Sequence, residues 1–134
     1  MSLTAADKSK LATYLRVLAD RMSLKDWTIE VQTEPADPEA HAEVRCVDGR
    51  KLAKVRFAHD WHEQPPEVLR HTCCHEMIHC HFALAWADME RRLEGPDRST
   101  FVMHLEYGID GMADAMAPFM PLFSEIANGP TQPD

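Results

Sequence analysis

The chain has 134 residues, of which 45% are hydrophobic and 27% are charged, and its formal net charge is −8. This length and composition predict one globular domain with its own core, over residues 1–125. An acidic chain without a basic stripe is a poor partner for nucleic acid or an anionic membrane, so we expect neither. No apolar run reaches the length of a membrane span, and the N-terminal stretch lacks a signal peptide's apolar block, which favours the cytoplasm.

The first half of the chain predicts one helix followed by three short strands. Thr4 and Asp7 resemble a helix cap, and leucines at helical spacing follow, so we expect a helix over 4–22. Apolar and polar residues alternate in WTIEVQT, HAEVRCV and KLAKVRFA, as they do in strands with one buried face. Asp48-Gly49 between the last two runs predicts a hairpin. We therefore expect an antiparallel meander of three strands.

The second half of the chain predicts two long helices. A helix can begin at Pro65 or Pro66, and no helix breaker follows before Gly95. A further helix covers about 97–117, and the segment 126–134 has a disordered composition. The fold class is thus α+β, with an N-terminal helix, a three-stranded antiparallel sheet, a long central helix and a C-terminal helix.

The four cysteines are Cys46, Cys73, Cys74 and Cys80. On a helix, the last three point in directions or lie at separations that exclude a disulfide among them. Cys46 alone could pair with one of the others. We therefore expect reduced, mostly buried thiols, which suits the cytoplasm.

The central helix contains the motif His75-Glu76-Met77-Ile78-His79, which is H-E-x-x-H. Two histidines four residues apart lie on one helix face and can bind one Zn²⁺, while the intervening Glu76 can act as a general base toward a zinc-activated water. The alternative is a histidine-rich helix that binds no metal. Apolar side chains opposite the histidines predict a largely buried helix, and these are Cys73, Met77, Cys80 and Leu84.

A catalytic zinc site needs a third protein ligand, and it must come from another helix. Glu90 and Glu94 lie about 16 Å or more beyond the second histidine along the same helix. The last predicted helix offers His104, Glu106 and Asp110. Glu106 and Asp110 border the apolar stripe of that helix, whereas His104 faces outward, so we favour Glu106 and keep His104 as the alternative. Asp110 could then accept the Nδ1–H of a liganding histidine.

The remaining histidines of the central helix have competing interpretations. His71 lies one turn before the motif and is a further alternative ligand, although it more often would line the cleft. His81 points away from the ligand face, which favours a hydrogen-bonded structural role. Phe82 and Trp86 follow on a face similar to that of His79, and we expect them in the core.

Peptide hydrolysis also calls for a group that stabilises the oxyanion of the transition state. His59 and His62 flank Trp61 in the loop before the central helix, which could overhang a metal. Tyr107 on the last helix is a competing candidate for the same role.

These residues resemble the gluzincin pattern H-E-x-x-H … E-x-x-x-D, and the order of elements over 27–117 is similar to minimal zincin domains such as SprT-like peptidases and the phage-associated ImmA/IrrE peptidases. The resemblance implies that the strand before the active-site helix, roughly 51–58, binds the peptide substrate as an added strand. It implies the following site residues: His75, His79 and Glu106 as zinc ligands, Glu76 as general base, and Asp110 as the partner of a ligand histidine.

The function that we predict is zinc-dependent hydrolysis of a peptide or protein substrate, with one catalytic Zn²⁺ and Glu76 as the general base. The first alternative is a catalytically silent zincin-like domain that binds zinc and serves protein interaction or regulation. The second alternative is a structural helical protein without a metal.

Overall fold

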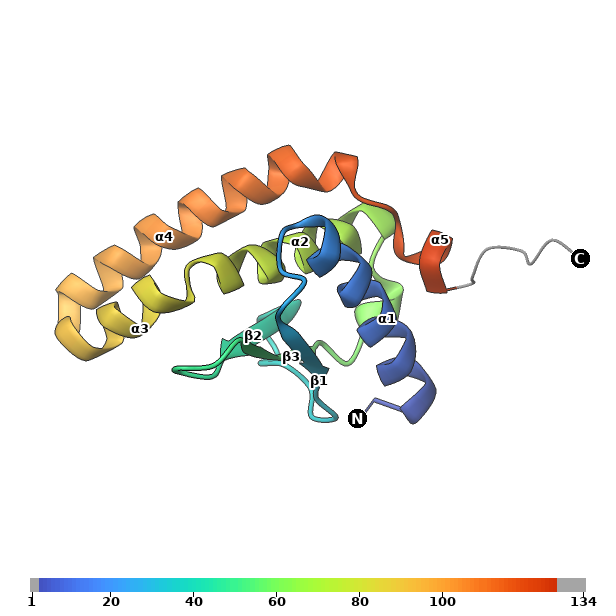
Figure 1. Cartoon of the computed structure of the whole chain (residues 1–134), viewed down its shortest axis with the longest axis horizontal. Helices are drawn as coiled ribbons and strands as arrows, with labels where there is room; N and C mark the ends of the chain where they lie inside the picture. Colours follow the sequence, from blue (N-terminus) through green and yellow to red (C-terminus); the bar gives the residue numbers. More distant parts are fainter. Residues whose placement is uncertain (1–2, 128–134) are drawn as a thin grey trace, which may run out of the picture.

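A computed structural model describes residues 3–127 of the chain. In this part of the chain, an N-terminal helix, a three-stranded mixed sheet and four further helices form an α+β fold (Figure 1). Short 3-10 turns cover Trp61–Glu63 and Ala117–Phe119. The elements are α1 (Ala5–Arg21), β1 (Thr28–Val31), β2 (Ala42–Cys46), β3 (Leu52–Phe57), α2 (Pro66–His81), α3 (Ala83–Arg92), α4 (Gly95–Met116) and α5 (Phe123–Ala127).

The sheet corrects the expected antiparallel meander. Its strand order is β1-β3-β2, with β2 antiparallel to β3 and β1 parallel to β3. The Asp48-Gly49 turn joins β2 and β3 as predicted, and Gly49 adopts a φ of +76°, which favours glycine. The connection 32–41 leads from β1, on one side of β3, to β2 on its other side. Alternation predicts which face of a strand is buried, but it does not predict which strand lies beside it.

The core lies where α1, the sheet and α2 meet. α1 begins at the predicted cap, since the Thr4 hydroxyl accepts a hydrogen bond of 3.1 Å from the backbone N–H of Asp7. Tyr14 is fully buried on α1, and its hydroxyl donates to the carbonyl of Pro121 at 2.8 Å. Other fully or nearly fully buried side chains in this core include Leu11, Leu15, Leu18, Val55, Phe57, Cys73, Met77 and Ile109.

The expected uninterrupted central helix is wrong, because the chain breaks at Phe82 into α2 and α3. Phe82 packs partly buried against the core, and the His81 ring nitrogen Nε2 lies 2.7 Å from the carbonyl oxygen of Met22. At the break, the backbone N–H of Phe82 donates to the carbonyl of His79 at 3.0 Å, and α3 begins with a bond from the N–H of Trp86 to the carbonyl of Phe82. Past the break α3 leaves the body, so Leu84 is 78% exposed rather than buried as expected.

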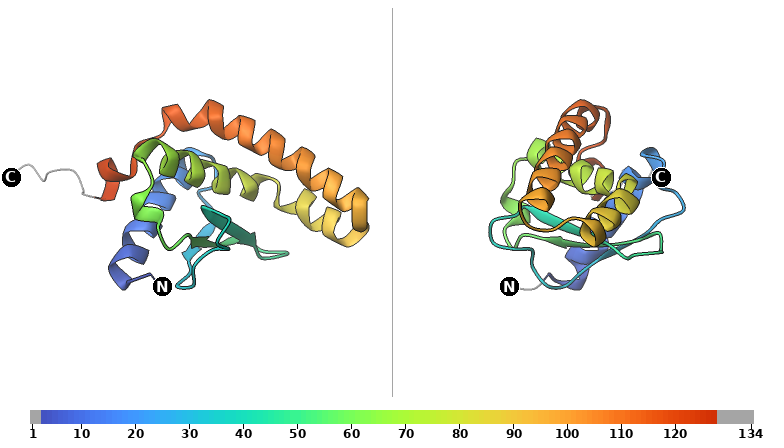
Figure 2. Two further views of the ribbon diagram at one scale, coloured as in Figure 1. Left: turned by 180° about the vertical axis from the view of Figure 1, so that it is seen from behind. Right: turned by 90° about the vertical axis from the view of Figure 1, so that its left-hand side faces the viewer.

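α4 reverses direction at Gly95, whose φ is +55°, and runs back alongside α3 and then α2 (Figures 1 and 2). Its buried residues, Ile109 and Ala113, lie in the half that contacts α2. The tip formed by α3 and the start of α4 extends beyond the sheet (Figure 2). This path brings the middle of α4 beside the H-E-x-x-H motif.

The last helix, α5, overlaps the tail for which the sequence predicted disorder. α5 includes the first two residues of the expected tail 126–134, and the rest of that tail lies outside the described residues. Within residues 3–127, none of the helices is both long enough and apolar enough to cross a membrane.

Candidate metal centre

The two motif histidines lie on one face of α2, and the opposite face of this helix is buried in the core. Cys73 and Met77 are fully buried, whereas the side chains of His75 and His79 keep 17% and 13% of their surface exposed. The two imidazole rings lie one turn apart, with centroids separated by 5.1 Å. The periodicity of the helix thus delivers both rings to the same side.

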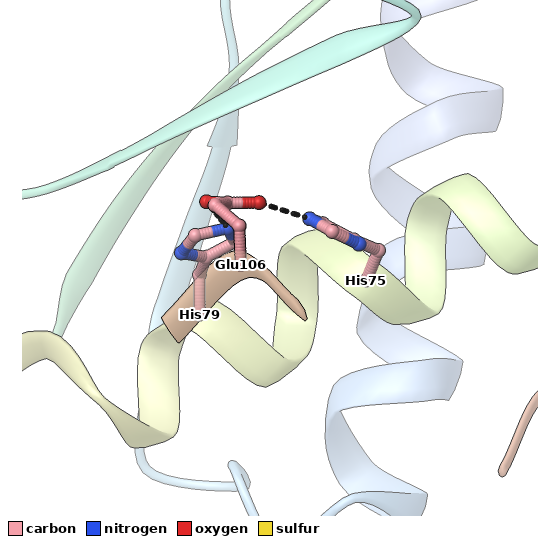
Figure 3. A group of neighbouring side chains, drawn as sticks. All are labelled: His75, His79 and Glu106. Carbon is pink, nitrogen blue, oxygen red and sulfur yellow. Dashed lines mark hydrogen bonds and ion pairs between the residues drawn. The ribbon is translucent and has the colours of Figure 1, made fainter. Parts of the chain in front are cut away.

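α4 brings Glu106 to both histidines (Figure 3). His75 Nε2 lies 3.0 Å from Glu106 Oε2, and His79 Nε2 lies 2.9 Å from Glu106 Oε1. One ligand atom from each of the three residues lies within 4.8 Å of the others. Two imidazole nitrogens and one carboxylate oxygen are a donor set that zinc uses in proteins. His75, His79 and Glu106 therefore form a half-buried group that could hold a metal ion.

Hydrogen bonds within this group shift the pKa values of Glu106 and His75. The hydrogen bonds with His75 and His79 lower the pKa of Glu106 to about 2. The hydrogen bond to Glu106 raises the pKa of His75, although burial of the ring acts in the opposite direction. The carboxylate of Glu106 thus accepts a hydrogen bond from each ring, and the ligand atoms of the three residues converge.

Asp110 lies one turn after Glu106, and its Oδ1 is 3.4 Å from His75 Nδ1. The carboxylate is placed where the predicted partner of a ligand histidine would lie. Asp110 is also 3.5 Å from Nε2 of His71, which in turn lies 2.9 Å from Asp114 Oδ1. His71 does not belong to the group around Glu106 and has acidic partners of its own.

Glu76 points toward β2 and is only 7% exposed. Burial raises the pKa of this carboxyl group to about 8, while the charge of His75 and a hydrogen bond from the backbone of Val44 lower it. A cation held by the neighbouring ligands would also lower it, because positive charge stabilises a carboxylate. The predicted general base thus lies in a sheltered position beside the ligand group.

A cavity of about 1140 Å³ opens in front of the ligand group, and Glu76 lines it together with His75, His79 and Glu106. Its other walls come from the segment between α1 and β1, from residues 40–51 around β2, from α3 and from Asp110 on α4. The volume is slightly above the range of about 300–1,000 Å³ that is usual for small-molecule sites, so the cleft has room for a larger ligand such as a peptide. We refer to this cavity as the cleft.

The edge of the sheet that borders the cleft is β2, not β3 as expected for the segment 51–58. β3 is paired with β1 on one side and β2 on the other, so an added strand cannot pair with it. At the two ends of the β2–β3 ladder, backbone hydrogen bonds join Ala58 to His41 and Val47 to Leu52. In an antiparallel ladder, every second residue of a strand is bonded to the partner strand, so the backbone groups of Glu43 and Arg45 also face β3. The N–H and C=O groups of Ala42, Val44 and Cys46 therefore turn toward the open edge.

The predicted oxyanion-stabilising residues lie elsewhere. His59 and His62 are exposed in the loop before α2, where the His62 ring packs edge-on against Trp61. Tyr107 is 85% exposed on α4. None of these residues lines the cleft, and neither does the alternative ligand His104, which is exposed as expected.

Trp86 is a residue that sequence reasoning assigned to the core and that the structure places at the cleft. It is partly exposed, and its ring lies edge-on to the His79 ring at a centroid distance of 5.2 Å. Trp86 follows His79 by seven residues, which predicts the same helix face for both. Trp86 is partly exposed on this face because α3 leaves the body of the domain after Phe82.

The four cysteines have no disulfide, as expected: Cys73, Cys74 and Cys80 are buried and Cys46 is partly buried. Cys46 Sγ and Cys80 Sγ lie 4.0 Å apart across the contact between β2 and α2. The thiols thus help to pack the edge strand against α2.

Comparison of the chain with protein-family models, with curated proteins and with solved structures gave no match.

Proposed function

We propose that the protein is a zinc-dependent metallopeptidase of the gluzincin type. The observation that carries the proposal is the convergence of the ligand atoms of His75, His79 and Glu106 within 4.8 Å, beside the sheltered carboxylate of Glu76. The helical spacing supplies two nitrogens, and a carboxylate from a distant helix supplies the oxygen. Zinc commonly binds such a set with one position left for water or substrate.

Each residue has a defined task in this proposal. A zinc ion held by His75, His79 and Glu106 would supply Lewis acidity and lower the pKa of water. Glu76 accepts a proton from the attacking water and passes it to the leaving amine. Asp110 holds the His75 ring through Nδ1 and so keeps Nε2 directed at the ligand group.

The open edge of β2 supports a peptide substrate. An extended peptide that pairs with Ala42, Val44 and Cys46 would lie in the cleft and pass the ligand group. Backbone pairing of this kind recognises an extended chain rather than one side chain. Trp86 adds an apolar wall on the α3 side of the cleft.

Zinc analysis combined with Glu76→Gln tests the proposal. We expect stoichiometric zinc in both proteins, and a loss of peptidase activity of at least about 100-fold in the variant, because the general base is removed. Glu67→Gln is the matched control, since Glu67 is an exposed acid in the first turn of the same helix and does not line the cleft. Full activity of Glu76→Gln, or wild-type protein without zinc at the motif, would contradict the proposal.

One observation favours the second candidate, a catalytically silent zincin-like domain. His59, His62 and Tyr107, the residues predicted to stabilise an oxyanion, do not line the cleft. A peptide-library screen separates the two functions. A domain that holds zinc and binds extended peptides without cleaving any of them would be the silent form.

A further inference from the structure

The site around Glu106 is one end of a longer series of facing residues. On α2, histidines recur every four residues, and on α4, carboxylates recur every four residues, so each series follows one helix face. The two faces meet where α4 runs alongside α2. The series are His71, His75 and His79 on α2, and Glu106, Asp110 and Asp114 on α4.

The far end of the series contains a second group of ligand atoms. His71 Nε2 lies 2.9 Å from Asp114 Oδ1 and 3.5 Å from Asp110 Oδ1. One ligand atom from each of these three residues lies within 4.8 Å of the other two. This compactness matches that of the group around Glu106, although the donor set has one imidazole and two carboxylates.

The surroundings of His71 Nε2 also resemble those of a metal ligand. Nε2 is shielded from solvent, although the whole side chain is 30% exposed, and it forms an ion pair of 2.9 Å with Asp114 Oδ1. A shielded nitrogen that faces two carboxylates converges with them on one point, as the ligands of a cation do.

We propose that His71, Asp110 and Asp114 bind a second divalent cation, separate from the zinc site proposed above. The mixed imidazole and carboxylate set suits a first-row transition cation such as Zn²⁺ or Mn²⁺. The side chains of Asp110 and Asp114 are 56% and 70% exposed, so water can complete the coordination and the cation can enter from solvent. The cation also compensates the mutual repulsion of carboxylates one turn apart on α4.

Asp110 links the two sites. Its Oδ1 lies 3.4 Å from His75 Nδ1 and 3.5 Å from His71 Nε2. A cation bound between His71 and Asp114 fixes the position of Asp110, and Asp110 in turn orients the His75 ring. The second cation thus acts as a positioning element for a ligand of the first site.

Two residues allow the sites to be tested separately, because His79 belongs to the first group alone and Asp114 to the second alone. Zn²⁺ binding is measured by equilibrium dialysis followed by metal analysis, on wild type, His79→Ala and Asp114→Asn. Asp97→Asn is the matched control, an exposed acid in the first turn of the same helix. Circular dichroism of each variant verifies folding, and Glu106→Gln replaces His79→Ala if that variant does not fold.

The expected result is about two equivalents of Zn²⁺ in wild type and in the control, and about one in each site variant. The remaining site of Asp114→Asn should also bind zinc up to about 10-fold more weakly, because Asp110 is less firmly placed. Wild type with one equivalent that Asp114→Asn retains and His79→Ala loses would overturn the second site and leave the first intact. One equivalent lost only in Asp114→Asn would instead support the second site and contradict the proposed function.

Discussion

Glu106 illustrates how one side chain joins two helices at the residue scale. Each of its oxygens contacts one histidine of α2, and the side chain keeps 39% of its surface exposed. A carboxylate so placed does not serve the core, whose members on α4 are Ile109 and Ala113. Its contacts therefore concern the ligand group rather than packing.

Replacing Glu106 with Gln removes the one anionic ligand of the group. We expect this change to weaken zinc binding at His75 and His79 by at least about 100-fold, since even indirect partners of ligands contribute 10–100-fold. Competition with a chromogenic chelator measures the affinity. Glu90→Gln should bind as wild type does. Unchanged affinity in Glu106→Gln would show that another residue is the third ligand, and His104→Ala would then be measured.

At the scale of the element, α2 has two faces with separate tasks. One face carries His71, His75 and His79, and the opposite face, with Met77, is fully buried in the core. Site and stability thus depend on different side chains of the same helix, although they share its backbone.

Met77→Ala should therefore destabilise the fold while leaving the ligand set in place. Truncating a fully buried methionine costs about 2–5 kcal/mol of unfolding free energy. Urea unfolding followed by circular dichroism measures this change. Leu84→Ala, at a side chain that is 78% exposed, should change stability by no more than about 0.5 kcal/mol. Similar losses in the two variants would contradict the packing described for α2 and α3.

The edge strand β2 is the second element whose two sides differ. The N–H of Arg45 belongs to the ladder with β3, whereas the N–H of Val44 turns toward the cleft and Glu76. Proline lacks this N–H and is tolerated in strands at positions directed away from the ladder.

Ala42→Pro, at another outward-facing position, should keep the fold but impair peptide binding in the cleft, seen as a higher KM for any cleaved peptide. Val44 is left unchanged because its backbone N–H donates to Glu76. Arg45→Pro should cost at least about 1 kcal/mol more in unfolding free energy, because it removes a hydrogen bond of the ladder. Thermal unfolding and steady-state kinetics measure the two effects. An unchanged KM in a folded Ala42→Pro protein would show that substrate does not pair with this edge.

Across the whole molecule, the candidate site connects α2, which packs in the core, with α4, which contributes few buried residues. α4 contributes Ile109 and Ala113 to the buried set, and α3 contributes Met89. A metal bound between α2 and α4 would bind the folded chain alone, because the ligands lie far apart in the sequence.

Zinc should therefore raise the melting temperature of the protein. A ligand present at about 100 times its Kd stabilises by about 2.7 kcal/mol, which corresponds to roughly 10 °C for a domain of this size. Differential scanning calorimetry with zinc and after chelation measures the shift. His75→Ala with His79→Ala should lose most of it. A melting temperature that does not respond to zinc or to chelation would contradict a metal bound by the folded state.

Much of this protein follows from its sequence by local rules. Thr4 caps α1, Asp48-Gly49 makes the hairpin, and the motif from His75 to His79 places two rings on one face. Each depends on residues within a few positions of one another, where propensity and periodicity act directly. The choice of Glu106 and Asp110 over His104 also followed from helical geometry, since the outward face of α4 could be recognised from its apolar stripe.

Contacts between distant segments were decided only by the tertiary structure. β1 passes over its neighbour in sequence to pair with β3, and the central helix breaks at Phe82, which packs partly buried against the core. The break turns Leu84 to solvent and Trp86 to the cleft, and the pairing places β2 at the edge of the sheet that borders the cleft. The helix faces and the chemistry that they carry follow from the spacing of residues along each helix. Which faces meet depended on long-range packing, because many arrangements satisfy the same local pattern and only the folded core selects one.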